Sequence, residues 1–197
     1  MPTDTARNDL KRPLRSRLPR RIRVALRWIE RGLAIFGGLV ALSWLTIDTS
    51  VIISQSMSPT LQGTNVDTGD RVLAEKVSYW FRRPHRWEVV TFVDNSGQKV
   101  MKRVVGLPGE SVQMREPRVL LIDGRPVDCP PSFERKYLQF GNLTDGKPVP
   151  CGTGYYVLGD YLQDSEDSRF EGPVPPGRII GRAWLIFWPW ARLGWVR

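Results

Sequence analysis

Serine and lysine are the side chains of this sequence best suited to covalent chemistry, because the other usual catalytic groups are scarce. The 197 residues include one histidine and two cysteines. The histidine, His85, stands among arginines and next to a proline, which is typical of a surface turn and does not favour a Ser-His-Asp triad. Multi-histidine and four-cysteine metal sites lack their ligands. We therefore expect no metal and no cofactor.

A serine can still be activated by a lysine that has lost its proton. Burial disfavours the charged form of lysine and lowers its pKa, and the neutral amine can then act as a general base toward a hydroxyl. Hydroxyls cluster in SQSMSPTL at residues 54–61, and Lys102 lies within an apolar strand-like run. Alternate residues of a strand share a face, so Lys102 should point with Val100 and Val104. The residues alone equally allow a solvent-reaching Lys102 on an edge strand and an ordinary loop hydroxyl at Ser56.

The basic charge of the chain is concentrated at one end. Residues 1–31 hold ten of the 29 basic residues and three of the 20 acidic ones, which is +7 of the total charge of +9. A basic segment without interleaved aromatic residues before Trp28 favours contact with anionic lipid over nucleic acid. We therefore expect membrane lipid as a partner and no nucleic acid.

An uncharged stretch follows this basic tail. Residues 32–47 contain no charged side chain and would span roughly 24 Å as a helix, and apolar residues at 28–29 and 51–53 could lengthen the span. The alternatives are a buried core helix or a cleaved signal peptide, but the run ends without a small-residue cleavage site. The sequence predicts a cytoplasmic tail at 1–31, a transmembrane anchor at 32–48 and, by the positive-inside rule, an extracytoplasmic catalytic domain at 49–197.

The segment after residue 48 has the pattern of a mainly β protein. Short apolar runs broken by Gly, Pro, Asn and Asp predict strands at 71–74, 88–93, 99–105, 111–114, 119–122, 155–158 and 179–187. Hairpin turns are indicated at 94–97 and 123–124. The expected fold is an antiparallel β-sheet catalytic domain. A Pro-rich stretch at about 112–154 predicts a small inserted β/loop subdomain, in which Cys129 and Cys151 are either a disulfide or two thiols.

Four ordered blocks resemble type I signal peptidases, membrane-bound Ser-Lys endopeptidases of the S26 family. The blocks are SQSMSPTL at 54–61, GDRVL at 69–73, KRVVGLPGE at 102–110 and GDYLQDSEDSR at 159–169. They follow one apolar segment, and the resemblance runs from about residue 33 to the end of the sequence. It implies a serine endopeptidase anchored by one membrane helix.

The resemblance assigns roles to individual residues. Ser56 would be the nucleophile and Lys102 the general base, and the Ser56 N–H and Ser54 hydroxyl would form the oxyanion hole. Ser165 would orient the lysine amine. Asp167 and Arg169 would be a structural ion pair near the site, with a surface salt bridge worth ~0–1 kcal/mol as the alternative.

The sequence also departs from the family pattern. The departures are at Ile53, Tyr161, Leu162 and Glu171. They concern substrate preference and loop packing more than catalysis, because the residues with assigned roles are all retained.

The resemblance implies signal peptides of exported preproteins as substrates, with small side chains at positions −1 and −3. An extended substrate can pair with a strand edge and place alternate side chains in shallow apolar pockets. Residues that either form the pocket walls or belong to the ordinary core are Ile52, Met57, Leu61, Val100 and Met101. The tryptophan-rich run at 187–195 is likewise either core or a patch at the membrane interface.

The leading hypothesis is thus a membrane endopeptidase that removes N-terminal signal peptides. One alternative is a dedicated S26 maturation peptidase for a single exported substrate. A catalytically silent membrane scaffold is another, and the presence of both Ser56 and Lys102 argues against it.

Overall fold

The computed structural model describes residues 19–115, 119–133, 141–143 and 146–197. The chain divides into two compact units, the first ending at Leu45 and the second running from Thr46 to Arg197. The first 18 residues of the predicted basic tail lie outside the described residues.

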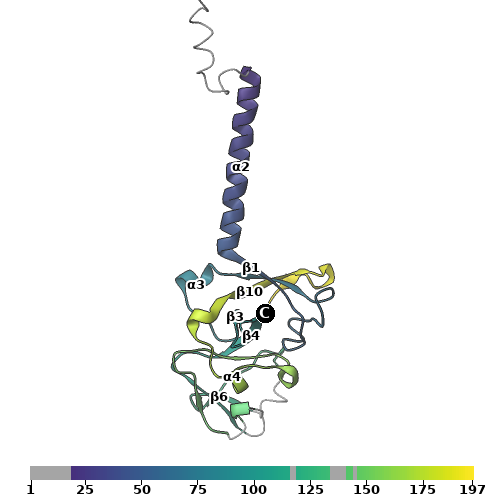
Figure 1. Cartoon of the computed structure of the whole chain (residues 1–197). Helices are drawn as coiled ribbons and strands as arrows, with labels where there is room; N and C mark the ends of the chain where they lie inside the picture. The colour runs from purple at the N-terminus through teal and green to yellow at the C-terminus, as the bar shows by residue number, and fades with distance from the viewer. Residues whose placement is uncertain (1–18, 116–118, 134–140, 144–145) are drawn as a thin grey trace, which may run out of the picture. The chain divides into compact units, whose positions relative to one another are not determined.

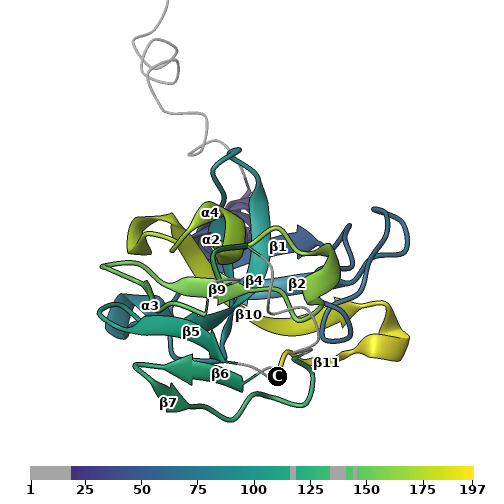
Figure 2. The same cartoon turned by 90° about the horizontal axis from the view of Figure 1, so that it is seen from below.

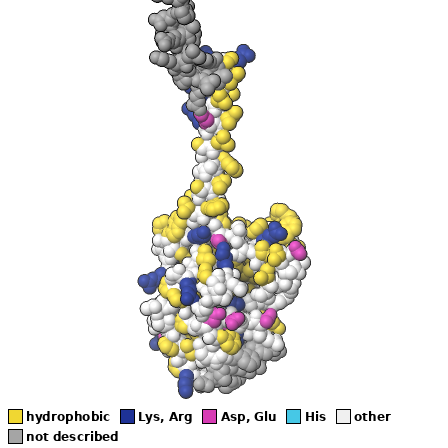
Figure 3. Space-filling model, viewed as in Figure 1, with side chains coloured by type: hydrophobic (Ala, Val, Ile, Leu, Met, Phe, Trp, Pro, Cys, Tyr) yellow, Lys and Arg dark blue, Asp and Glu magenta, His cyan; other side chains and the backbone are white. Residues whose placement is uncertain are grey.

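One long helix dominates the first unit. Helix α2 (Arg20–Thr46) is continuous, has no buried residue within the structure, and is long and apolar enough to cross a membrane (Figure 1). Its 27 residues would span about 40 Å. Basic side chains gather toward its N-terminal part, and hydrophobic ones follow along it (Figure 3).

The helix boundaries differ from the predicted ones at both ends. The helix begins at Arg20, twelve residues before the predicted anchor, because the arginines, alanine and leucine of residues 20–31 are good helix formers and continue the apolar run without a break. The proposed lengthening through residues 51–53 is wrong. The chain leaves the helix at Thr46 and forms strand β1 (Ile47–Val51), which pairs with β2 (Arg71–Glu75).

An antiparallel sheet forms the centre of the second unit. Its strand order is β1-β2-β10-β3-β4-β9, and β11 pairs with β10. The remaining strands are β3 (Val89–Val93), β4 (Lys99–Gly106), β9 (Tyr156–Leu158), β10 (Ile179–Trp188) and β11 (Gly194–Trp195). Every pairing is antiparallel, so the predicted mainly β fold class is confirmed.

A smaller sheet is built from the middle of the chain. Its order is β7-β6-β5-β8, and β5, β6 and β7 run next to one another in Figure 2. The bounds are β5 (Ser111–Arg115), β6 (Val119–Ile122), β7 (Arg125–Pro126) and β8 (Val149–Pro150). These strands pair only among themselves in the described part of the chain, over the range predicted as an inserted subdomain.

Short helices connect the strands of the second unit. Among the described residues, the α-helical ones are α3 (Ser78–Phe81) and α4 (Ser168–Glu171). The described 3-10 turns are η2 (Gly141–Leu143), η3 (Leu162–Asp164), η4 (Pro176–Arg178) and η5 (Trp190–Arg192).

Alternation along the strands divides the core. Val89 on β3 and Met101 on β4 belong to one buried cluster, whereas Val90, Phe92 and Val104 belong to another. This is the period of two expected for a sheet covered on both faces. Lys102 thus shares a strand face with Val104, as the sequence pattern predicted.

The two cysteines and the tryptophan-rich end resolve two open alternatives. Cys151 is buried in the cluster beneath the smaller sheet, Cys129 packs against that cluster, and both are thiols. Burial raises the pKa of Cys151 to about 11.

The tryptophans of the C-terminal run are largely exposed, Trp190 at 71% and Trp195 at 57%, so the interpretation of this run as core is wrong.

Candidate active site

The loop between β1 and β2 carries the predicted nucleophile, and hydrogen bonds join its two ends. The Ile52 N–H donates to the Asp70 carbonyl at 2.9 Å, and the Gln62 N–H donates to Asp70 Oδ2 at 2.8 Å. A Cβ at Gly69 would collide with the Ile52 carbonyl, so glycine is needed for this close approach. We call residues 52–70 the nucleophile loop.

Ser56 is held at a turn of this loop. The Ser58 N–H donates to the Gln55 carbonyl at 2.8 Å, and Ser56 itself is only 6% exposed. The hydroxyl oxygens of Ser54 and Ser56 lie 3.1 Å apart. The two serines that the resemblance assigns to nucleophile and oxyanion hole are therefore neighbours within hydrogen-bond distance.

Lys102 is buried on β4, with 5% of its surface exposed. The pKa of its amine is lowered to about 8: burial is the largest cause, the carboxylates of Asp167, Asp164 and Glu166 oppose the shift, and the Arg169 charge adds to it. An amine with such a pKa is partly neutral near physiological pH, which a general base requires.

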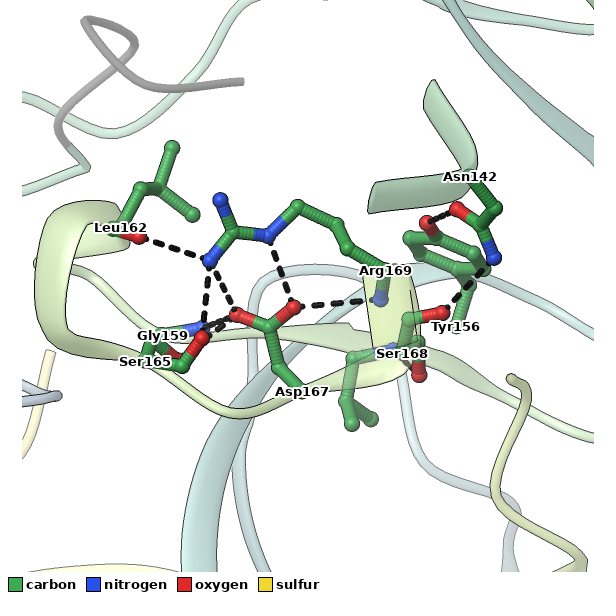
Figure 4. Close-up of polar contacts among 9 residues, drawn as sticks. Asn142, Tyr156, Gly159, Leu162, Ser165, Asp167, Ser168 and Arg169 are labelled. Carbon is green, nitrogen blue, oxygen red and sulfur yellow. Dashed lines mark hydrogen bonds and ion pairs between the residues drawn. The ribbon is translucent and has the colours of Figure 1, made fainter. Parts of the chain in front are cut away.

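The final block, residues 159–169, is organised around the carboxylate of Asp167 (Figure 4). Asp167 Oδ2 accepts from the Ser165 hydroxyl at 2.7 Å and from the Gly159 N–H at 3.1 Å. Asp167 Oδ1 accepts from Arg169 Nε at 2.8 Å, and Arg169 Nη2 donates to the carbonyls of Leu162 and Ser165. Asp167 and Arg169 are both almost fully buried, so the alternative of a surface salt bridge is wrong.

Gly159 brings the final block against the nucleophile loop. A Cβ at this position would overlap the Ser56 carbonyl and the Ser165 hydroxyl. The next contact is a hydrogen bond of 3.0 Å from the Tyr161 N–H to the Ser56 carbonyl. The proton of the Ser165 hydroxyl is engaged by Asp167, which leaves the lone pairs of that oxygen to accept from another donor.

These residues line one groove of about 690 Å³. The predicted residues among its lining are Ile52, Ser54, Ser56, Met57, Val100, Met101, Lys102, Ser165 and Asp167. Leu61 is not among them, because it is fully buried in the core cluster with Met57 and Val72. Its assignment as a pocket wall is corrected to a core position.

Sequence reasoning missed part of the groove. Further apolar lining comes from Ile53, Phe92, Val157, Phe170 and Val174, and further acidic lining from Asp94, Asp164, Glu166 and Glu171. Asp164, Glu166 and Phe170 lie in or next to the final block, so the sequence could have predicted that they line the groove. Phe92 and Val174 could not be predicted in this way, because nothing in the sequence around them separates a groove residue from a core residue.

A buried ion pair next to Lys102 was also missed. Arg103 Nε and Nη2 donate to the two carboxylate oxygens of Asp160, each at 2.6 Å, and Arg103 is 1% exposed. Arg103 Nη2 also donates to Thr60 Oγ1 at 3.2 Å. The pair therefore joins the strand of Lys102 to the final block and to the nucleophile loop. The sequence features that could have predicted this ion pair are the arginine directly after Lys102 and the Gly-Asp at the start of the final block.

The remaining candidates for other chemistry do not converge. His85 is exposed at its turn. Among the described residues, no group of three or more His, Cys, Asp or Glu side chains could hold a metal ion. The groove does contain Ser56 within hydrogen-bond distance of Ser54, Lys102 with its lowered pKa, and the Ser165 hydroxyl, which donates to the buried carboxylate of Asp167.

The groove brings together the groups that a hydrolase working through a serine would need. A comparison with protein families identifies which one: the family described as signal peptidase, peptidase S26, matches residues 25–188, and the chain belongs to this family. The resemblance predicted from the four sequence blocks is confirmed.

Individual relatives agree with the family. The chain is 40% identical to signal peptidase I of Leptolyngbya laminosa over 154 residues, which cover 73% of this chain and 70% of that protein. It is 32% identical to probable signal peptidase I-2 of Synechocystis over 181 residues, or 85% and 76% of the two chains. A crystal structure of a signal peptidase I from Enterococcus faecalis is 29% identical, with a TM-score of 0.42 over 51% of this chain and 97% of that one.

Proposed function

We propose that this chain is a membrane-bound serine endopeptidase that cleaves N-terminal signal peptides from exported preproteins with a Ser56–Lys102 dyad. The observation that carries the proposal is the common groove of Ser54, Ser56 and Lys102, in a chain of the signal peptidase family.

The reaction proceeds through an acyl-enzyme. The neutral amine of Lys102 takes the hydroxyl proton of Ser56 as the oxygen attacks the scissile carbonyl carbon. The Ser56 N–H and the Ser54 hydroxyl donate to the oxygen that becomes negative. The lysine ammonium then gives its proton to the leaving amine, the peptide bond breaks, and the neutral lysine activates the water that hydrolyses the ester.

Ser165 positions the amine in this scheme. Because its hydroxyl proton is donated to Asp167 at 2.7 Å, its oxygen can accept from the lysine amine and hold the lone pair of Nζ toward Ser56. Asp167 thus orients Ser165, and Arg169 holds Asp167 in place through the ion pair of 2.8 Å.

The groove suits an extended peptide with small side chains near the scissile bond. Residues 50–54 and 98–102 both line it, and its apolar walls include Ile52, Met57, Val100 and Met101. Such walls favour small apolar residues at positions −1 and −3 over charged ones, since a buried charge without a partner is costly.

Helix α2 anchors the enzyme in lipid. Its N-terminal part carries five arginines from Arg20 to Arg31, and the positive-inside rule places that end in the cytoplasm. The unit that begins at Thr46 then lies on the extracytoplasmic side, where exported preproteins present their cleavage sites.

Cleavage of a purified preprotein by the full chain in detergent micelles tests the proposal. The wild type should release a mature protein whose new N-terminus follows a small residue at −1. Ser56→Ala and Lys102→Ala should each lose at least about a thousandfold in kcat. The control Lys147→Ala, an exposed lysine of the smaller-sheet region, should cleave like wild type. Full activity in either dyad variant would overturn the mechanism.

A further inference from the structure

The C-terminal aromatic segment, residues 188–195, reverses the chain beside the nucleophile loop. Strand β10 ends at Trp188, the turn η5 follows, and β11 returns to pair with β10 at Leu185 and Ile186. The Arg192 N–H donates to the Pro189 carbonyl at 2.8 Å, so the backbone of Arg192 is fixed by the turn. Its side chain contacts residues more than a hundred positions earlier in the sequence.

The Arg192 side chain forms hydrogen bonds with the nucleophile loop at two places. Its Nε and Nη2 donate to the two carboxylate oxygens of Asp70 at 2.8 and 2.9 Å. The same Nη2 donates to the carbonyls of Thr60 at 3.1 Å and Pro59 at 3.4 Å. Asp70 is 1% exposed, and a two-point contact of this kind fixes distance and direction together.

The groups that Arg192 holds control the position of Ser56. Asp70 closes the base of the loop through Ile52 and Gln62. Pro59 and Thr60 belong to the turn that directly follows Ser56, in which the Leu61 N–H donates to the Met57 carbonyl at 2.8 Å. Displacement of either contact would therefore move the turn that carries the nucleophile.

The opposite side of this turn is held by the core. The Thr60 hydroxyl donates to Asp160 and accepts from Arg103, both nearly fully buried. Arg103 thus anchors the side chain of Thr60 while Arg192 anchors its carbonyl. The turn after Ser56 is therefore held on one side by the buried Arg103 and on the other by Arg192 of the aromatic segment.

We infer that Arg192 is a positioning residue for the nucleophile, acting through Asp70 and the Pro59–Thr60 carbonyls. This inference rests on the proposed function. Arg192 does not line the groove, so it acts on the rate of Ser56 attack and not on substrate affinity. A misplacement of a reacting group by about 1 Å can cost a hundredfold in rate. Lysine would replace it only in part, because an ammonium is a point charge without the planar fork.

Kinetics of the full chain in detergent test this role, with Arg192→Ala, Arg192→Lys and the control Arg125→Ala. Arg125 is an exposed arginine of β7 in the smaller sheet. Arg192→Ala should lower kcat by about 10- to 100-fold and leave KM within about threefold. Arg192→Lys should fall between Arg192→Ala and wild type, and Arg125→Ala should match wild type.

A second readout separates positioning from folding. The rate constant for acylation of Ser56 by a small serine-directed reagent, followed by intact mass, should fall in parallel with kcat. The final stoichiometry should stay at one label per chain. Asp70→Asn should lower the same rate constant, and the double variant should lose little more than Arg192→Ala alone, because both changes break the Arg192–Asp70 contact while only Arg192→Ala also removes the contacts with the Pro59 and Thr60 carbonyls.

Several results would overturn the inference. They are an unchanged rate constant with fewer labelled chains, a rise in KM alone, or an Arg192→Lys variant equal to wild type. A wild type that cleaves no preprotein would instead count against the proposed function. The acylation rates would still decide whether Arg192 positions Ser56.

Discussion

In the proposed mechanism Lys102 has to be neutral to take a proton and charged to return it, so its pKa would control the rate. Burial sets that pKa at about 8, well below the usual value of 10.5 for lysine. The three carboxylates of Asp164, Glu166 and Asp167 keep it from falling further. A lysine in this position is therefore tuned by two opposing effects, the low polarity of its strand face and the acidic residues of the final block.

We expect kcat/KM to follow the neutral fraction of Lys102. Below pH 8 the amine is protonated, so kcat/KM should fall about tenfold for each pH unit, and above pH 8 it should approach a plateau. The measurement is the initial rate on an uncharged peptide from pH 6 to pH 9.5. Glu166→Gln removes a charge that raises the pKa and should shift the midpoint downward. A flat profile between pH 6 and pH 9 would contradict the assignment.

At the scale of elements, the longer strands could be predicted and the short ones could not. The apolar runs at 88–93 and 99–105 indicated β3 and β4, because each run is long enough to stand out from the turn residues around it. Strands β7, β8 and β11 have two residues each, too few for any period. Strand β1 was misjudged, since its apolar ends were read as an extension of the membrane helix.

In the candidate site, too, the sequence predicted the residues that stand in a local pattern and missed contacts between distant positions. The four blocks indicated Ser56, Lys102 and Ser165, because each stands in a local pattern. The contacts of Arg192 with Asp70 join positions 122 residues apart, and no local pattern reveals them. Burial of Arg103 and Arg169 was equally hidden, since a charged residue is buried only when a partner compensates it.

The buried pair of Asp167 and Arg169 should stabilise the final block far more than a surface pair would. Asp167→Asn removes the carboxylate that is paired with the buried Arg169 guanidinium, and the free energy of unfolding should fall by about 3–5 kcal/mol. The matched control is Lys99→Met, which breaks a partly exposed pair with Asp48 at 2.8 Å and should cost ~0–1 kcal/mol. Urea denaturation of both variants measures the difference, and equal losses would contradict it.

At the scale of the whole molecule, the charge distribution and the division into units describe the same organisation. The N-terminal segment of 31 residues carries +7 of the total charge of +9. Every residue that lines the candidate groove belongs to the unit from Thr46 to Arg197. The candidate groove is thus confined to one unit, and the other has the composition of a membrane anchor.

This division predicts that residues 46–197 retain the chemistry but lose efficiency on membrane substrates. The strand pairing and the core clusters lie within these residues, so the truncated chain should fold. It should cleave a water-soluble signal peptide with kcat/KM within about tenfold of the full chain. On a preprotein inserted in vesicles it should be slower by about 10²-fold or more, because a shared membrane raises the effective concentration of enzyme and substrate.

The two substrates should be compared in one experiment, with the Ser56→Ala form of each chain as the blank. Loss of activity on both substrates together with a cooperative thermal transition would show that α2 contributes to the groove itself. Equal rates of the two chains on vesicles would show that anchoring does not bring enzyme and substrate together. Selective loss on vesicles is the result expected if the helix serves only to hold the groove at the membrane where signal peptides reside.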